Sequence, residues 1–332
     1  MAEELFGTGG VLEAIWGWPP PMLDPAGPYA APVTTLAWVL IAIGLVVTAI
    51  IVAALYVAWR GPERWRRALG GERAVWIGGI AFPALVLTAL LVWGLMLTAS
   101  LSSPITGTER RIRVTGEMWW FRVDYLGPDG AVIARDANEI HLPVGEPVVL
   151  ELRSADVIHS FWVPHLSGKK DMIPGRTTLL RLEADRPGRW GGVCAEYCGG
   201  PHALMGFVAV THEPEAYRRW LAGRMIGRPR PSGEPLAVAG DPALGRQLFM
   251  DSGCGACHRV AGTQANGLAG PDLTHLGSRL TLGAGILPNH RGTLIGWIGD
   301  SQSIKPGNRM PSYDRLSAEQ LDAIAAWLEQ QT

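Results

Sequence analysis

Two long uncharged apolar segments stand out in the pattern of hydrophobic and polar positions along the chain. Residues 33–59 and 74–101 contain no Asp, Glu, Lys or Arg. Each segment exceeds the roughly 20 residues that a helix needs to cross about 30 Å of hydrocarbon. The pattern therefore predicts a hairpin of two transmembrane helices within residues 33–107. Pro83 is expected to kink the second helix, because proline removes a backbone donor.

Basic residues gather between the two predicted spans. Residues 60–73 hold five arginines, whereas the first 32 residues hold no Lys or Arg. Because basic residues favour the cytoplasmic side, this loop is expected inside the cell and both ends of the chain outside. The sequence thus predicts a cell-membrane protein with two spans in contact with lipid. Its N-terminal segment, 1–32, and everything after about residue 102 would face the periplasm.

From about residue 110 the pattern changes to short segments in which apolar and polar residues alternate. Turn signals such as Gly127-Pro128 and Pro187-Gly188 separate these segments. Several short strands at this spacing are typical of an all-β sandwich, which we expect at 108–222. A Gly-, Pro- and Arg-rich stretch at 223–240 indicates a linker to a last domain at 241–332. The formal net charge of −1 gives no reason to expect binding to nucleic acid.

Helix-capping signals mark the beginning and the end of the last domain. Asp241 is expected to cap a helix that begins near Pro242. Ser317 is expected to cap the final helix, with Gln320 at its third position.

The four cysteines of the chain lie in two short clusters, and the first lies within the expected sandwich. Its Cys194, Cys198, His202 and Met205 are four, four and three residues apart, and His159 lies 35 residues upstream. Thiolate, imidazole and thioether ligands together suit copper. Two cysteines and two histidines favour two copper ions bridged by both thiolates. The alternatives are structural disulfides, or a copper-delivery protein that binds one metal at the C-x-x-x-C pair.

The second cluster, Cys254, Cys257 and His258, forms the C-x-x-C-H signature of covalent c-type haem. Both thiols can add to the haem vinyl groups, and His258 then becomes the proximal ligand. Met310 is the expected distal ligand, since methionine raises the reduction potential and suits electron transfer. Met250 competes with it but is expected to pack in the core. A zinc or thioredoxin-like site is the alternative, and the adjacent histidine argues against it.

The segment "CAEYCGGPHALM", residues 194–205, resembles the binuclear CuA motif of subunit II of haem–copper cytochrome c oxidases. The resemblance extends from about residue 20 to 220 through "TGEMWWFRVDY", "SADVIHSFWVP" and "KKDMIPGR". It implies a cupredoxin fold, with the Glu196 carbonyl on one copper and its side chain on a magnesium ion shared with subunit I. It also implies that electrons from cytochrome c arrive at Trp119. Met118 and Phe121 depart from the glutamine and tryptophan that are usual in the family.

The last domain is similar to small class I cytochromes c through "GPDLTHLGSR" and "SAEQLDAIAAWLEQQ". In that family, the proline that matches Pro271 supports the axial histidine through its carbonyl. The whole chain therefore resembles the fused subunit II of caa3-type oxidases. It would be a multidomain membrane protein with a two-helix hairpin, an all-β cupredoxin sandwich and an all-α class I cytochrome c.

This resemblance implies that the chain is the electron-accepting subunit of an oxidoreductase. Its haem would take electrons from a cytochrome or an upstream respiratory complex and pass them through CuA to the haem of subunit I, which reduces O2 to water. Subunits I and III are the expected partners. A nitrous oxide reductase would need a large multi-histidine domain, and a quinol-oxidase subunit II would lack the copper ligands. A membrane-anchored copper-delivery protein remains the alternative function.

Overall fold

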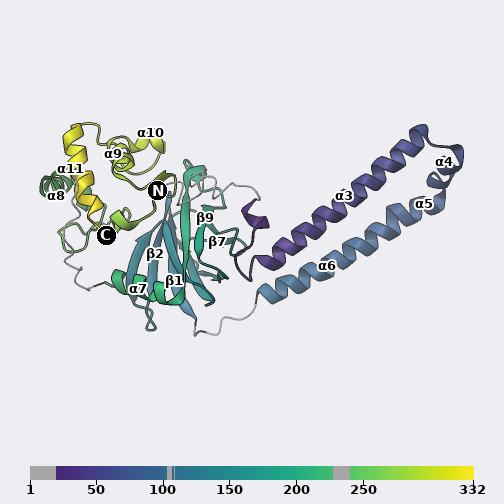
Figure 1. Cartoon of the computed structure of the whole chain (residues 1–332), viewed down its shortest axis with the longest axis horizontal. Coiled ribbons are helices and arrows are strands. Elements are labelled where there is room, and N and C mark those ends of the chain that lie inside the picture. Colours follow the sequence, from purple (N-terminus) through teal and green to yellow (C-terminus); the bar gives the residue numbers. More distant parts are fainter. Residues whose placement is uncertain (1–19, 103–106, 108, 227–239) are drawn as a thin grey trace. The chain divides into compact units, whose positions relative to one another are not determined.

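The computed structural model describes residues 20–102, 107, 109–226 and 240–332. The first 19 residues of the expected periplasmic N-terminal segment and most of the expected linker lie outside the described residues. The chain divides into two compact units, one formed by residues 31–107 and the other by the remainder. Each unit is described by itself below (Figure 1).

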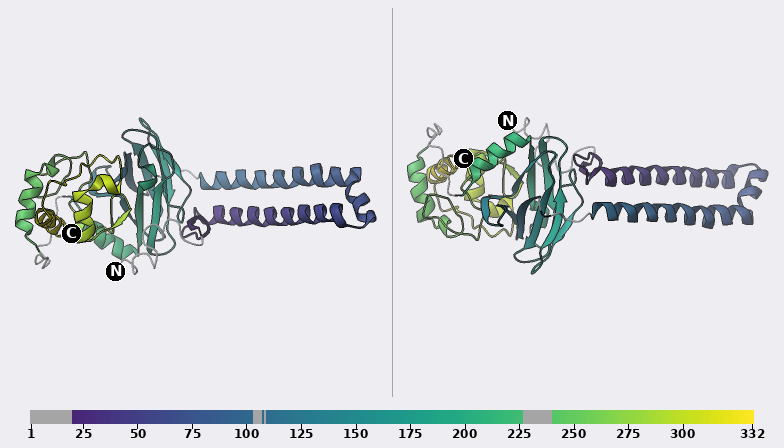
Figure 2. Two further views of the ribbon diagram at one scale, coloured as in Figure 1. Left: turned by 90° about the horizontal axis from the view of Figure 1, so that it is seen from above. Right: turned by 90° about the horizontal axis from the view of Figure 1, so that it is seen from below.

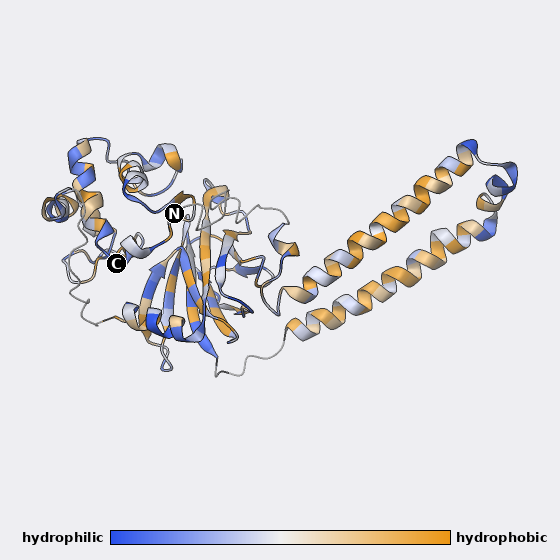
Figure 3. Cartoon of the chain, in the orientation of Figure 1, coloured by the Kyte–Doolittle hydropathy of each residue, from blue (hydrophilic) through white to orange (hydrophobic). Residues whose placement is uncertain are grey.

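Residues 31–102 form the helical hairpin. Its long helices are α3 (Ala31–Arg60) and α6 (Phe82–Leu101), joined through α4 (Glu63–Leu69), α5 (Glu72–Trp76) and a π-helical segment, Ile77–Ala81. Both long helices are apolar around their whole circumference, while the connection between them is polar (Figure 3). By length and composition, Ala31–Arg60 and Glu72–Leu101 could cross a membrane. The π-helical segment ends at Ala81, two residues before Pro83, and the kink expected at Pro83 stays a prediction.

The sandwich consists of two five-stranded sheets, with strand orders β3-β2-β1-β5-β8 and β4-β10-β9-β6-β7 (Figure 2). The first sheet contains β1 (Arg110–Glu117), β2 (Trp120–Leu126), β3 (Val132–Ala137), β5 (Val148–Ser154) and β8 (Thr178–Leu182). The second contains β4 (Glu139–Pro143), β6 (His159–Trp162), β7 (Lys170–Met172), β9 (Gly188–Cys194) and β10 (Gly206–His212).

Aromatic side chains from both sheets fill the space between them. Phe121 meets Phe207 edge to face with ring centroids 5.0 Å apart, and Phe161 stacks on Phe207 at 4.5 Å. All three side chains are almost fully buried. In the second sheet, β6 pairs with β9 so that Phe161 lies opposite Cys194. This register brings the beginning of β6, at His159, close to the end of β9, at Cys194.

Helix α7 (Pro214–Arg224) packs against β4 and β10 of the second sheet. Two short 3-10 turns complete this part of the chain, Pro21–Leu23 and His202–Leu204. Residues 20–30 also pack on the sandwich, because the Ala26 N–H donates to the His165 carbonyl at 2.7 Å.

The last domain is formed by four helices around a small core. They are α8 (Pro242–Asp251), α9 (Arg291–Gly299), α10 (Ser301–Ile304) and α11 (Ala318–Glu329). As expected, the Asp241 side chain accepts from the first-turn amides of α8, and Ser317 forms a capping box with Gln320. Helices α8 and α11 cross closely at Gly245, where a Cβ would lie 1.9 Å from the Ala323 carbonyl oxygen.

Two 3-10 turns and a short hairpin complete the last domain. They are 3-10 turns at Cys254–Ala256 and Leu276–Ser278, and a hairpin of β11 (Thr281–Leu282) and β12 (Leu287–Pro288). The hairpin was not expected from the sequence. Its turn contains Ala284 with a φ of 70°, between two glycines that also have positive φ. Such a turn requires the left-handed region, which glycine adopts without steric cost.

Candidate functional site

The side chains of the first cysteine cluster meet at one end of the sandwich. Cys194 Sγ and Cys198 Sγ are 3.8 Å apart, and His159 Nδ1 lies 3.9 Å from Cys194 Sγ. His202 Nδ1 lies 3.4 Å and Met205 Sδ 3.8 Å from Cys198 Sγ. The ligand atoms of His159, Cys194 and Cys198 all lie within 4.8 Å of one another, and all three residues are buried. Strands β6 and β9 and the loop after β9 thus bring the sequence-predicted donors together.

His159 is held in one orientation by a carboxylate. Its Nε2 is 2.8 Å from Asp156 Oδ1, which leaves Nδ1 turned toward the sulfur atoms. Burial alone would lower the pKa of His159, but hydrogen bonds with Cys194 and Asp156 raise it above its ordinary value. Such a partner on the far ring nitrogen fixes the tautomer of a metal-binding histidine. From the sequence alone, Asp156 would pass as an ordinary turn or surface charge.

The two thiols influence each other's ionisation. The hydrogen bond with Cys198 lowers the pKa of Cys194 well below its usual value, and the same contact raises the pKa of Cys198. One thiolate therefore forms readily, while the second ionisation costs free energy because two negative sulfur atoms would lie side by side. A cation bound between the sulfurs removes that cost. The donor set therefore fits a metal of the soft or borderline kind, such as copper.

Glu196 contributes to this end of the sandwich through its main chain. Its carbonyl oxygen lies 3.2 Å from Cys194 Sγ, whereas its carboxylate extends outward to Lys169 Nζ at 3.1 Å. Both charged side chains of this pair are more than two-fifths exposed. The structure therefore places the carbonyl of Glu196 at the sulfur cluster and its carboxylate at the surface.

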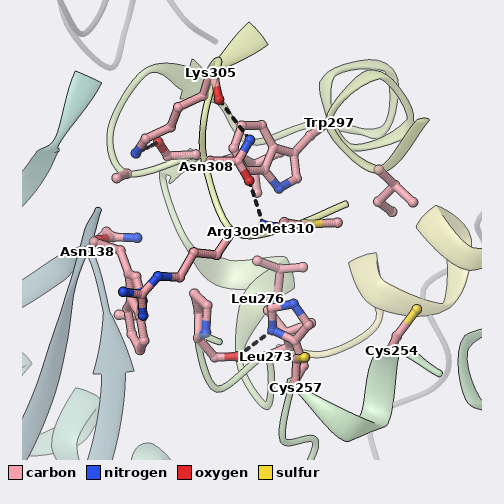
Figure 4. Close-up of a pocket in the computed structure, with 18 of the residues that line it drawn as sticks. Asn138, Cys254, Cys257, Leu273, Leu276, Trp297, Lys305, Asn308, Arg309 and Met310 are labelled. Atoms are coloured by element: carbon pink, nitrogen blue, oxygen red, sulfur yellow. Dashed lines mark hydrogen bonds between the residues drawn. The ribbon is translucent and has the colours of Figure 1, made fainter. Parts of the chain in front are cut away.

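The second cysteine cluster lines a cavity of about 370 Å³ (Figure 4). Cys254, Cys257, His258 and Met310 all contribute to its wall, and most of the remaining lining is apolar. His258 Nδ1 is 2.8 Å from the Pro271 carbonyl, so Nε2 is left available to the cavity. Burial lowers the pKa of His258 and favours the neutral imidazole. Gly270 lies against the ring, because a Cβ there would be 2.7 Å from His258 Cε1.

Met310 is held through its main chain. Its N–H donates to Asn308 Oδ1 at 2.7 Å, and its carbonyl accepts from Gln302 Nε2 at 2.6 Å and Ser301 Oγ at 2.9 Å. Met250 packs against the core of the last domain, as expected. The cavity thus offers an imidazole, a thioether and two cysteines among apolar side chains. This set fits a covalently bound haem with two axial ligands.

Trp119 belongs to both candidate sites, the sulfur cluster and the cavity of the last domain. Its indole Nε1 donates to the Cys198 carbonyl at 2.9 Å, and the residue also lines the cavity of the last domain. The ring packs on the backbone that follows Cys198, since a Cβ on Gly200 would lie 3.1 Å from Trp119 Cζ2. Lys305 Nζ donates to the Trp119 carbonyl at 2.7 Å. Burial lowers the pKa of Lys305 to about 7.

Other histidines make contacts that support the fold. His141 Nδ1 lies 2.7 Å from His212 Nε2, and burial lowers the pKa of His212 to about 4. His165 lies 3.9 Å from Asp24 and beside Trp190. His290 caps α9 by accepting from the Thr293 N–H. Sequence reasoning missed Lys305, which carries no motif, and the pairing of His141 with His212.

Comparison with known proteins assigns both domains that follow the helical hairpin. Residues 116–211 match the family model "Cytochrome C oxidase subunit II, periplasmic domain", and residues 242–332 match "Cytochrome c". The cytochrome c oxidase subunit 2 of Alkalihalophilus pseudofirmus is 36% identical over 317 residues, which are 92% of this chain and 89% of that protein. The protein of the same name from Bacillus subtilis is 28% identical over 287 residues, covering 81% of this chain and 78% of that protein.

A solved structure is also similar. It is the periplasmic domain of subunit II of cytochrome oxidase (CoxB) of Bradyrhizobium japonicum, 28% identical, with a TM-score of 0.32. The match covers 35% of this chain and 92% of the CoxB chain. The subunit II domain implies CuA and the cytochrome c domain implies haem. Membership of this family also implies a partnership with subunit I. The chain belongs to the cytochrome c oxidase subunit II family, carries a cytochrome c domain on the same polypeptide, and is thereby part of a haem–copper oxidoreductase complex.

Proposed function

We propose that this chain takes electrons from an external donor at its cytochrome c domain and delivers them through the sandwich to subunit I. When bound, haem c and CuA would each supply a one-electron redox centre. The observation that carries the proposal is the position of Trp119, which lines the cavity and donates to the main chain of Cys198. A single side chain thus links the two candidate cofactor sites.

The sulfur cluster would hold the copper. Cys194 and Cys198 would bridge the two ions, with His159 and His202 as terminal ligands and Met205 and the Glu196 carbonyl completing the set. Asp156 would keep the His159 ring turned toward the metal. The short contacts between these donors, all within one loop and two strand ends, support this assignment.

The cavity of the last domain would hold the haem. Cys254 and Cys257 would form the thioether bonds, and His258 and Met310 would be the axial ligands. Pro271 would orient His258, because its carbonyl accepts from Nδ1 and directs Nε2 into the cavity. The main-chain bonds of Met310 would keep its thioether at the opposite wall.

The remaining expectations are proposals of the same kind. The arginines between the spans support an orientation with both external domains in the periplasm. Subunit III, a donor cytochrome or upstream respiratory complex, membrane lipid, and a magnesium ion at Glu196 on the subunit I interface belong to this proposal. The proposed domains are 1–32, 33–107, 108–222, 223–240 and 241–332.

Replacing Trp119 tests the proposed route. In Trp119→Ala, electron transfer from haem to CuA should slow by at least about tenfold, equivalent to about 1.4 kcal/mol of activation free energy. The reason is the loss of both the packing and the hydrogen bond that join the cavity to Cys198. The measurement is the absorbance change of each centre after rapid reduction of the haem in the loaded protein.

Trp120→Phe is the matched control. Trp120 adjoins Trp119 and also lines the cavity. Its side chain packs against Ala137 and Ala284, whereas Trp119 packs on the backbone after Cys198. Its replacement should leave the rate almost unchanged. Equal rates in Trp119→Ala and the native protein would contradict the route, and a single copper without haem would favour the copper-delivery alternative.

A further inference from the structure

A second group of buried titratable side chains lies in the sandwich, apart from the sulfur cluster. Asp136, Glu139 and His141 offer ligand atoms within 4.8 Å of one another, and all three are buried. They occupy the end of β3 and the beginning of β4, where the chain crosses from one sheet to the other at Asn138. Burying two carboxylates is costly unless cations or donors compensate them.

The compensating groups come from the cytochrome domain. Arg279 Nε donates to Asp136 Oδ1 at 2.7 Å, and the side chains of this ion pair are 5% and 1% exposed. The next residue, Leu280, donates its N–H to Glu139 Oε2 at 2.8 Å. The guanidinium therefore supplies a buried positive charge beside Asp136, and a main-chain N–H compensates Glu139.

The sandwich side of this contact is rigidly supported. Glu139 Oε1 is 2.8 Å from His141 Nε2, and His141 Nδ1 is 2.7 Å from His212 Nε2. Trp220 of α7 stacks on the His141 ring with centroids 4.0 Å apart. The His141 N–H donates to the Tyr125 hydroxyl at 2.8 Å. These contacts hold the carboxylate of Glu139 from the sandwich side.

Other contacts also join the sandwich to the cytochrome domain. The Gly206 N–H donates to the Ala284 carbonyl at 2.9 Å, in the unexpected hairpin turn of the cytochrome domain. Arg122 Nη2 donates to the Leu268 carbonyl at 2.7 Å, and Arg309 lies 3.5 Å from Asp156. The cation groups of the cytochrome domain thus meet carboxylates of the sandwich. The buried pair of Arg279 with Asp136 is little screened by salt, whereas Arg309 is more than half exposed.

We propose that Asp136 and Glu139 form a receptor for residues 279–280 that locks the cytochrome domain onto the sandwich, with Arg279 as the positioning residue. The lock keeps the cavity that contains His258 and Met310 beside Trp119, so the two domains exchange electrons from one fixed arrangement. The proposal deepens the proposed function and rests on it, because a fixed arrangement matters only if electrons pass between the domains.

Hydrogen exchange in the full chain as purified tests the lock. In Asp136→Asn, residues 132–142 and 276–287 should exchange at least about tenfold faster, because Arg279 is left as a buried unpaired charge. Arg279→Met should act in the same direction by leaving Asp136 unpaired. The double variant should exchange more slowly than either single variant, since no unpaired buried charge then remains.

Arg291→Met is the matched control. Arg291 pairs with Glu329 at 2.7 Å and Asp322 at 3.0 Å, all within the cytochrome domain. Its loss should speed exchange in α9 and α11 and leave residues 132–142 unchanged. Unchanged exchange in Asp136→Asn, or strictly additive effects in the double variant, would overturn the lock.

A second readout separates this proposal from the proposed function. Pulsed EPR between oxidised CuA and ferric haem should give a narrow distance distribution in the native protein and a broad one in Asp136→Asn. If the native protein lacks either spectroscopic signal, the proposed function fails, while the exchange results still decide the lock. If both signals are present and the distribution stays narrow in Asp136→Asn, the lock alone is wrong.

Discussion

Cys198→Ser is expected to abolish the binuclear copper centre and to leave the covalent haem in place. Cys198 is the junction of the cluster, since its sulfur lies within 4 Å of Cys194, His202 and Met205. A serine hydroxyl keeps its proton at neutral pH and is a hard ligand, so it cannot bridge two copper ions. Oxidation of the donor by the assembled oxidase should fall by more than about a hundredfold, equivalent to about 2.7 kcal/mol in the barrier.

The experiment combines copper quantitation, EPR and turnover in one preparation. The reciprocal control is Cys257→Ser, which should weaken covalent haem attachment and leave the EPR signal of the copper intact. The side chain of Cys257 lies in the cytochrome domain and takes no part in the sulfur cluster. A Cys198→Ser protein that keeps two copper ions and normal turnover would show that Cys198 is not a bridging ligand.

Met310→Ala should convert the haem from a low-spin His/Met form to one without the thioether ligand. The reduction potential should fall, because methionine ligation raises the potential of haem. His258 remains held by the Pro271 carbonyl, so the proximal side of the site is expected to survive. Electron delivery to the sandwich should then slow, and the visible spectrum together with a redox titration measures both changes.

Met250→Ala is the control for this experiment. Met250 packs against the same small core but does not line the cavity. Because Met250 is only partly buried, its loss should lower the free energy of unfolding by about 0.5–3 kcal/mol and leave the low-spin spectrum unchanged. A low-spin His/Met spectrum that persists in Met310→Ala would mean that another residue is the distal ligand.

Most of the fold could be predicted because its elements follow regular patterns of apolar and polar residues. The apolar runs predicted α3 and α6, and alternation with turn pairs predicted the sandwich. Alternation failed at β4 (Glu139–Pro143), whose residues are all buried. Helix α7 covers this strand, and the cytochrome domain meets its Glu139 side chain. The polar face of this strand, with Glu139 and His141, is therefore covered by partners that the alternation of a single sequence does not show.

The candidate site was predictable where its residues are close in sequence or carry a motif. The spacing of Cys194, Cys198, His202 and Met205 identified them as a set, and C-x-x-C-H identified the haem site. The pair of Arg279 with Asp136 spans 143 positions, and neither residue belongs to a motif. Lys305 likewise reads as a surface lysine until the structure places it on the Trp119 carbonyl. Contacts between domains leave little trace in a single sequence.

The most direct test of the proposed dicopper and haem centres is metal and haem analysis of the purified native chain. The account predicts two copper ions per chain, whose EPR spectrum shows one unpaired electron shared between two nuclei. It also predicts one porphyrin that stays on the polypeptide after denaturation. Zinc in place of copper, a single-copper EPR pattern, or haem released by denaturation would contradict it.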